Sequence, residues 1–140
     1  FVSLAAKLEV SRNSLEEYLT YMEDAGLISR LRESTSGIIG LGKVEKIYLD
    51  NPNLIHYLSQ SKTETGNIRE TFFLNQTRVN NPVTSSAVAD FKITDYTFEV
   101  GGRSKAQEQI KNTPNAFIVK DNIEYGYKNV VPLWAFGLNY

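Results

Sequence analysis

Cysteine is absent from this chain of 140 residues, and histidine occurs once, as His56. Disulfide scaffolds, zinc ribbons and thiol catalysis are therefore excluded, and so is a metal site built on several histidines. No apolar run approaches the roughly 20 residues that a membrane-spanning helix needs, and no signal peptide is visible. The chain begins with Phe1 and not with Met, and its first residues have the pattern of the middle of a longer sequence. We therefore expect a fragment of a longer cytoplasmic protein with no membrane partner.

A charge excess of either sign is also lacking, because 15 Lys and Arg stand against 16 Asp and Glu, for a net charge of −1. Strong non-specific binders of nucleic acid normally carry a basic excess, so the balance argues against that class. Hydrophobic residues make up 41% of the chain, which is enough for a packed core. The length suits one ordinary domain or two very small ones.

The first sixty residues have the pattern of a winged helix-turn-helix, in which a short helix, a tight turn and a longer helix precede two strands. Ser11 is a good N-cap for the longer helix, and Gly26 is placed to end it. We predict a winged-helix module at 1–60. Its expected elements are a helix over 3–8, a helix after Ser11, strands over 27–31 and 46–49, and a short helix over 53–58.

After a polar linker at 60–65, a second module is predicted at 66–140, with the order helix, three strands, helix, strand. Each module is small for an independent core, so we expect the two to pack together. The expected elements are a helix over 67–80, strands over 83–87, 89–93 and 96–100, a polar helix over 104–112, a buried strand over 116–119 and a final strand within 130–136.

The segment 90–100 alternates polar and apolar residues about a short turn, which predicts a β-hairpin. A two-residue turn at 94–95 places Asp90 opposite Glu99, with Cβ atoms about 5 Å apart. Like charges in this position destabilise a sheet unless a cation or a proton intervenes. The pair is either a metal site or a surface pair neutralised by Lys92, which lies on the same face. The predicted cross-strand pairs are Phe91 with Phe98, Ile93 with Tyr96, and Asp90 with Glu99.

Four segments, at 46–54, 69–73, 90–91 and 98–103, occur in the order found in a known family. With them, the whole chain resembles the C-terminal part of a family of prokaryotic AAA-type ATPases. The resemblance implies an α+β/α/β fold class, a winged helix-turn-helix followed by a restriction-endonuclease-like α-βββ-α-β domain. It also implies an upstream ATP-binding module as a partner, since no Gly-x-x-x-x-Gly-Lys-[Ser/Thr] motif occurs in this chain.

The resemblance also assigns roles to the hairpin acids. An active nuclease of that superfamily needs an acid and then Glu-x-Lys, in which the carboxylates hold a divalent metal such as Mg²⁺ and the lysine activates water. Asp90 and Glu99 match the carboxylates and metal ligands, and Glu70 could add a third acid. The lysine position, two residues after Glu99, is Gly101. Lys92 or Lys105 would have to replace the missing lysine.

We therefore expect a non-catalytic or degenerate nuclease-like accessory region that engages DNA or a partner protein, with no certain cofactor. The alternatives are an active Mg²⁺-dependent nuclease and a purely structural interaction domain. The segment 11–25 carries four acids against one base, a net −3, which favours a protein contact over DNA. Gly101 and Gly102 either cradle a phosphate or form a strand-to-helix turn. The candidate nucleic-acid contacts are Arg12, Arg30, Arg32, Lys43, Lys46 and Arg103.

Overall fold

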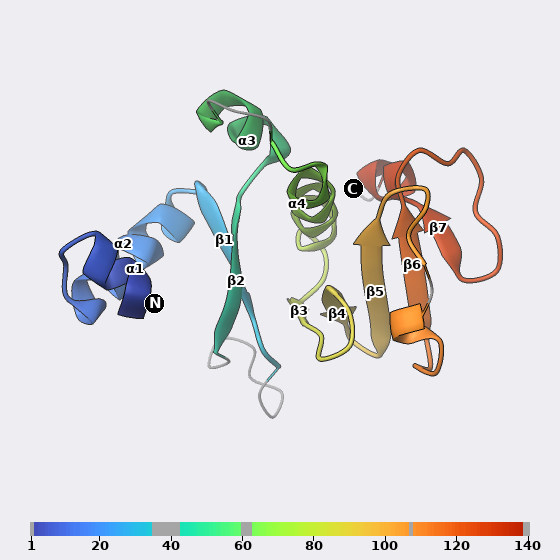
Figure 1. Cartoon of the computed structure of the whole chain (residues 1–140), viewed down its shortest axis with the longest axis horizontal. Helices are drawn as coiled ribbons and strands as arrows, with labels where there is room; N and C mark the ends of the chain where they lie inside the picture. The colour runs from blue at the N-terminus through green and yellow to red at the C-terminus, as the bar shows by residue number, and fades with distance from the viewer. Residues whose placement is uncertain (1, 35–42, 60–62, 107, 139–140) are drawn as a thin grey trace.

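The computed structural model describes residues 2–34, 43–59, 63–106 and 108–138, and these form a mixed α/β structure with two sheets. The helices α1 and α2 come first, and a two-stranded ribbon of β1 and β2 lies between them and the rest of the molecule (Figure 1). The α-helices are α1 (Val2–Lys7), α2 (Arg12–Asp24), α3 (Pro52–Leu58) and α4 (Thr65–Thr77). The strands are β1 (Ile28–Arg32), β2 (Val44–Leu49), β3 (Val83–Ser85), β4 (Phe91–Ile93), β5 (Tyr96–Gly101), β6 (Ala116–Lys120) and β7 (Val130–Pro132), and two 3-10 helices occupy Glu108–Ile110 and Leu133–Leu138.

The ends of α2 follow from local chemistry, as the sequence predicts. The side chain of Ser11 caps the helix by accepting the Ser14 backbone N–H at 3.0 Å. Gly26 follows the helix with a φ of 68°, a left-handed angle that costs glycine little. The chain then reverses into β1, which pairs with β2 in antiparallel fashion.

The larger sheet has the order β3-β4-β5-β6-β7. β3, β4 and β5 are antiparallel neighbours, whereas β5, β6 and β7 run parallel. Two of the three predicted hairpin pairs are confirmed, since Phe91 pairs with Phe98 and Ile93 with Tyr96. Asp90 precedes β4 and is not a ladder partner of Glu99, whose side chain is buried against Lys105. The turn has Thr94 at a φ of 52°, in the left-handed region used by two-residue hairpin turns.

The polar helix predicted over 104–112 is wrong, because the described residues of that segment form only the 3-10 helix Glu108–Ile110. Two contacts explain the difference. The Lys105 N–H donates to the Gly102 C=O at 2.9 Å, which closes a tight turn, and the Lys105 side chain reaches back to Glu99. The local turn and the side-chain contact with Glu99 together override the moderate helix propensity of the segment.

The β1–β2 ribbon shares a hydrophobic core with the larger sheet and α4. Leu31 is 1% exposed and packs in the same cluster as Phe73 and Phe91, both fully buried. The Tyr48 ring centroid lies 5.9 Å from that of Phe91. The residues on either side of the predicted linker therefore pack together, while the division at 1–60 and 66–140 stays a prediction. Within the residues described, no helix is both long and apolar enough to cross a membrane.

A candidate site of carboxylates and lysines

Asp90 lies directly before β4, at the point where the hairpin ladder ends. Its Oδ2 atom accepts the backbone N–H of Val100 at 2.9 Å, so a side-chain acceptor takes over where the backbone pairing stops. The side chain is 15% exposed. Asp90 is thus fixed against β5, on which Glu99 lies.

Glu99 is buried, with a side chain only 4% exposed, and its Oε1 lies 2.5 Å from Nζ of Lys105. A buried carboxylate needs such a partner because an unpaired charge in the interior is costly. The hydrogen bond from Lys105 to Glu99 raises the pKa of Lys105; burial acts against this, and the charges of Glu99, Asp90 and Glu70 add to the rise. Lys105 therefore stays protonated beside these carboxylates.

Gly101 provides the space that Lys105 uses. A Cβ atom added at Gly101 would lie 2.7 Å from both Cγ and Cδ of Lys105, closer than real carbon atoms approach. Gly101, two positions after Glu99, has no side chain, and the side chain of Lys105 lies over it. The ammonium beside the Glu99 carboxylate is thus that of Lys105.

A second lysine enters from the β1–β2 ribbon. Nζ of Lys46, on β2, lies 3.1 Å from Oε2 of Glu70 and 3.4 Å from Oδ1 of Asp90. Burial lowers the pKa of Lys46, but its hydrogen bond with Glu70 and the charges of Glu70 and Asp90 outweigh that effect, so the pKa is raised. Lys46 thus bridges α4 and the hairpin as a protonated ammonium.

Tyr48, two residues along β2, completes the contact with α4. Its phenol donates to Oε2 of Glu70 at 2.6 Å. Burial, and then the hydrogen bond with Glu70, raise the pKa of Tyr48, so the phenol stays neutral. One carboxylate oxygen of Glu70 therefore receives both a phenol and an ammonium from the ribbon.

Lys46 stands between two hollows in the surface. One, of about 510 Å³, is lined in part by Asp90, Lys92 and Glu45. The other, of about 470 Å³, is lined in part by Glu70 and Tyr48. The Lys46 side chain is 47% exposed, whereas those of Glu70 and Asp90 are 19% and 15% exposed. The ammonium thus covers two carboxylates that solvent reaches poorly.

The structure gathers four of the five predicted catalytic residues, namely Asp90, Glu99, Glu70 and Lys105. Lys92 is exposed and pairs with Thr97 across the hairpin. One of the two interpretations left open for the hairpin acids had Lys92 neutralise them; the ammonium partners are instead Lys46 for Asp90 and Lys105 for Glu99. Sequence reasoning missed Lys46 in this role, because 44 residues separate it from Asp90 and no local pattern marks the contact.

The metal that the family resemblance implies does not fit these residues as they stand. Within the part of the chain that the structure describes, no three or more Asp, Glu, His or Cys side chains gather so as to hold a metal ion. Mg²⁺ and Ca²⁺ need several oxygen ligands at short distance. Here ammonium groups already occupy the carboxylates of Asp90, Glu70 and Glu99.

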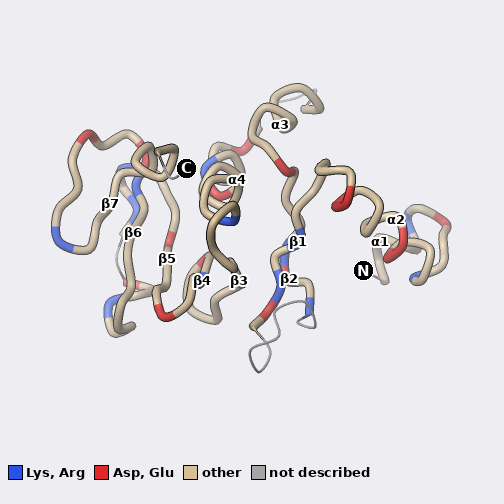
Figure 2. The backbone as a smooth tube through the Cα atoms, turned by 180° about the vertical axis from the view of Figure 1, so that it is seen from behind, with Lys and Arg blue, Asp and Glu red and all other residues tan. Residues whose placement is uncertain are grey.

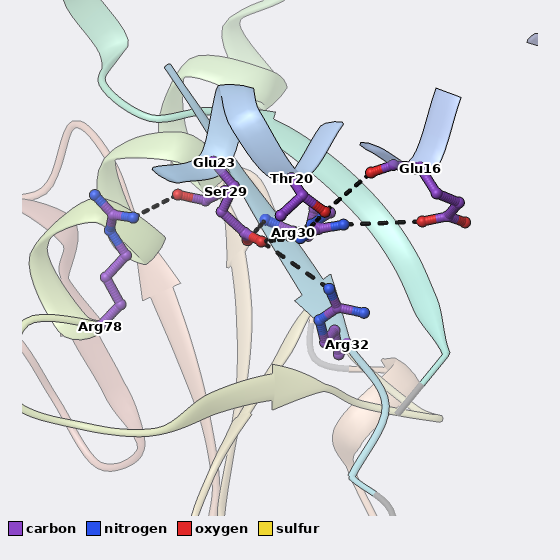
Figure 3. Close-up of polar contacts among 7 residues, drawn as sticks. All are labelled: Glu16, Thr20, Glu23, Ser29, Arg30, Arg32 and Arg78. Atoms are coloured by element: carbon purple, nitrogen blue, oxygen red, sulfur yellow. Dashed lines mark hydrogen bonds and ion pairs between the residues drawn. The ribbon is translucent and has the colours of Figure 1, made fainter. Parts of the chain in front are cut away.

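Arg30, a candidate nucleic-acid contact, is enclosed by α2. Its side chain is 7% exposed, and its Nε and NH2 atoms lie 2.6 and 2.5 Å from Oε2 of Glu23 (Figure 3). Glu16 lies 3.8 Å away on its other side. Burial raises the pKa of Glu23, but the bonds from Arg30 outweigh this and hold that pKa below its usual value. Arg30 therefore joins β1 to α2 and does not present its charge to solvent.

The other basic residues of the ribbon also face carboxylates, and Figure 2 shows basic and acidic positions side by side along β1 and β2. Arg32 lies 4.0 Å from Glu23, and Lys43 lies 2.9 Å from Glu45. The remaining two candidates, Arg12 and Arg103, are exposed. The ribbon thus carries little uncompensated positive charge for a phosphate backbone to meet.

Arg103 lies beyond β5, where further basic side chains come together. Its backbone C=O accepts from Nζ of Lys120 at 3.2 Å. Arg69, on α4, would lie 3.2 Å from a Cβ at Gly102 and is paired with Asp121 at 2.9 Å. A tight turn, with no helix at this point, follows the glycine pair, so a phosphate held on a helix N-terminus is not built here.

Comparisons with models of known protein families, with curated proteins and with solved structures find no match to this chain.

Proposed function

We propose that this chain is a non-catalytic, nuclease-like accessory region of a prokaryotic AAA-type ATPase, composed of a winged-helix module and a restriction-endonuclease-like module. The proposal rests on the sequence resemblance and on the arrangement of the site. The order of α4, the β3–β4–β5 meander and the parallel strand β6 agrees with it. The missing helix over 104–112 is the main departure from the expected α-βββ-α-β order.

One observation supports the non-catalytic assignment above the others. Each carboxylate of the site has an ammonium partner from its own chain, Lys46 for Glu70 and Asp90, and Lys105 for Glu99. A metal-dependent nuclease instead uses its carboxylates to hold the ion that stabilises the scissile phosphate. The two lysines neutralise the buried carboxylates, so the stability of this acidic cluster needs no catalytic role to explain it.

An active Mg²⁺-dependent nuclease is the second candidate, and a specific feature favours it. Lys105 contacts Glu99 through the space left by Gly101, which resembles a catalytic lysine that has moved along the sequence. Glu70 and Asp90 lie near enough to influence the pKa of the same lysine. In that case Lys46 would have to leave the carboxylates before a metal entered.

A cleavage assay separates the two candidates. The purified chain is incubated with supercoiled and linear DNA in millimolar Mg²⁺ or Mn²⁺, beside a Glu99→Gln variant as the matched control. We expect no cleavage above the background of the variant. Cleavage by the wild-type chain that disappears in Glu99→Gln would contradict the proposal and establish the nuclease.

The partner, DNA or protein, needs a separate measurement. The paired basic residues of the ribbon and the net −3 of the segment 11–25 favour a protein contact for this module. A gel-shift titration at increasing salt should therefore show weak DNA binding, with a slope that Arg12→Ala does not change. A steep salt slope that falls by about one unit in Arg12→Ala would assign DNA contact to α2.

A further inference from the structure

The outer face of α2 carries large apolar side chains that the rest of the fold leaves in solvent. α1 and α2 lie at one end of the molecule, on the side of the ribbon away from α4 (Figure 1). One face of α2 is buried, since Leu15 and Leu19 pack in a small core with Ile28. Away from this core, Tyr18 is 51% exposed and Tyr21 is 58% exposed. Single exposed apolar residues are ordinary, whereas contiguous ones mark interaction surfaces.

These side chains are contiguous. Tyr18, Tyr21 and Met22 are three and four residues apart, a spacing that makes side chains neighbours on a helix surface. The surface continues past the end of α2, where the Leu27 backbone N–H donates to the Met22 C=O at 2.9 Å. This bond is the longer one of a Schellman motif, which commonly brings the side chains of these two positions into contact. We call the four exposed residues Tyr18, Tyr21, Met22 and Leu27 the α2 patch.

Two acids flank the α2 patch. Glu17 lies four residues before Tyr21 and Asp24 three residues after it, so both are on the same side of the helix as this ring. Both acids are exposed. Glu17 Oε1 accepts the Tyr21 phenol O–H at 2.5 Å, which holds the carboxylate and the ring side by side. The patch therefore combines aromatic and aliphatic surface with negative charge.

We propose that the α2 patch binds a basic segment of a partner protein, one that presents arginine side chains beside apolar ones. A guanidinium can stack on a tyrosine ring while it pairs with a carboxylate, and Tyr21 with Glu17 offers both groups together. Tyrosine and arginine are also enriched among the residues that carry most of the binding energy of interfaces. A second copy of this chain is disfavoured, because a symmetric contact would set the two acidic faces against each other. The same negative charge disfavours DNA.

This inference deepens the proposed function and rests on it for the expectation that the chain acts through a partner. The probe is a fluorescein-labelled peptide of 13 residues, the length of α2, with leucine and arginine at helical spacing. A second peptide has glutamate in place of every arginine. The test variant combines Tyr18→Ala with Tyr21→Ala. Tyr57→Ala is the matched control, because it removes a tyrosine that is 85% exposed on a different helix, α3. Far-UV circular dichroism checks the fold of each variant.

Fluorescence anisotropy measures binding of each peptide. We expect the wild-type chain and Tyr57→Ala to bind the arginine peptide equally, and the Tyr18 and Tyr21 double variant to bind it roughly tenfold or more weakly. The glutamate peptide should not bind. Glu17→Gln combined with Asp24→Asn should weaken binding of the arginine peptide and reduce its dependence on salt. No binding of the arginine peptide by the wild type, equal binding of the two peptides, or an equal loss in Tyr57→Ala would overturn the inference.

Two further measurements separate the other occupants and the proposed function. A labelled DNA duplex that the wild type binds, and that the Tyr18 and Tyr21 double variant does not, would assign the α2 patch to DNA and overturn the inference. Sedimentation that shows a dimer lost in the same variant would assign the patch to a second copy and also overturn it. Absence of peptide binding overturns the inference alone, whereas cleavage of DNA by the wild-type chain overturns the non-catalytic assignment whatever the peptide does.

Discussion

Gly101 lies where the side chain of Lys105 crosses the backbone of β5. Gly101→Ala would place a methyl group 2.7 Å from Cγ and Cδ of Lys105, so the lysine must shift from Glu99. We expect a loss of about 1–3 kcal/mol in the free energy of unfolding, as for other overpacked sites. Gly66→Ala is the control, since no atom lies within 4 Å of its added Cβ and alanine favours the helix. Urea titration gives the free energies of unfolding of the wild type and both variants. A Gly101→Ala variant as stable as the wild type would show that the Lys105 side chain does not lie against Gly101.

Because of Lys105, we expect the free energy of unfolding to fall at alkaline pH. Its hydrogen bond to Glu99 holds its folded pKa above the ordinary value of 10.5. A raised folded pKa means that the stabilisation is complete below pH 10.5 and is lost as the pH rises through the folded value. Lys105→Met should cost roughly 3 kcal/mol near neutral pH, at the low end for a broken buried pair because Lys105 is 34% exposed.

The pH profile of that difference is the measurement. The free energies of unfolding of wild type and Lys105→Met should begin to converge above pH 10.5, where lysine in the unfolded chain loses its proton, and should meet only above the raised pKa of Lys105 in the folded protein. A difference that stays constant from neutral to strongly alkaline pH would show that the loss comes from packing and not from the charge.

At the scale of elements, Arg30 fastens β1 to α2 through Glu23 and Glu16. Arg30→Met removes the partner of these acids from a position only 7% exposed. Glu23 and Glu16 are 32% and 41% exposed and stay hydrated, so we expect a loss of about 1–2 kcal/mol. Lys43→Met breaks an exposed pair at the start of β2 and should leave the free energy of unfolding almost unchanged, because water screens such pairs. Chemical denaturation of both variants tests the contrast, and similar small losses would indicate that the Arg30 pair is solvent-screened.

The elements that sequence predicts well are those fixed by neighbours along the chain. The hairpin register follows from the alternation about the turn at 94–95, and α2 follows from its Ser11 cap and Gly26. The prediction of a helix over 104–112 is wrong, because it rests on local helix propensity and takes no account of the contact between the Lys105 and Glu99 side chains.

The candidate site shows the same limit more sharply. The hairpin pattern predicts Asp90 and Glu99 as site residues, and the family resemblance adds Glu70 and Lys105. Lys46 is predicted only as a basic residue of the ribbon, since its contacts with Glu70 and Asp90 span 24 and 44 residues. Such distant pairs arise from the packing of Leu31 and Tyr48 into the core, which no local pattern encodes.

The whole molecule should unfold as one unit, because the ribbon contributes to the core of the larger sheet. Leu31→Ala removes a side chain that is 1% exposed in this shared core, and we expect a loss of about 2–5 kcal/mol. Far-UV circular dichroism follows the helices, and Trp134 fluorescence follows the end of the chain near β7. The two probes should give coincident transitions in wild type and variant. Separate transitions would mean that the two predicted modules fold independently.

A lysine of the ribbon, Lys46, is the counter-ion of Asp90, which lies directly before a strand of the larger sheet. A double-mutant cycle of Lys46→Met and Asp90→Asn measures this pair directly, by the free energies of unfolding of the four proteins. The contact at 3.4 Å, with Asp90 mostly buried, predicts a coupling energy of about 1 kcal/mol or more. Losses that add within about 0.3–0.5 kcal/mol, as for distant residues, would contradict the account.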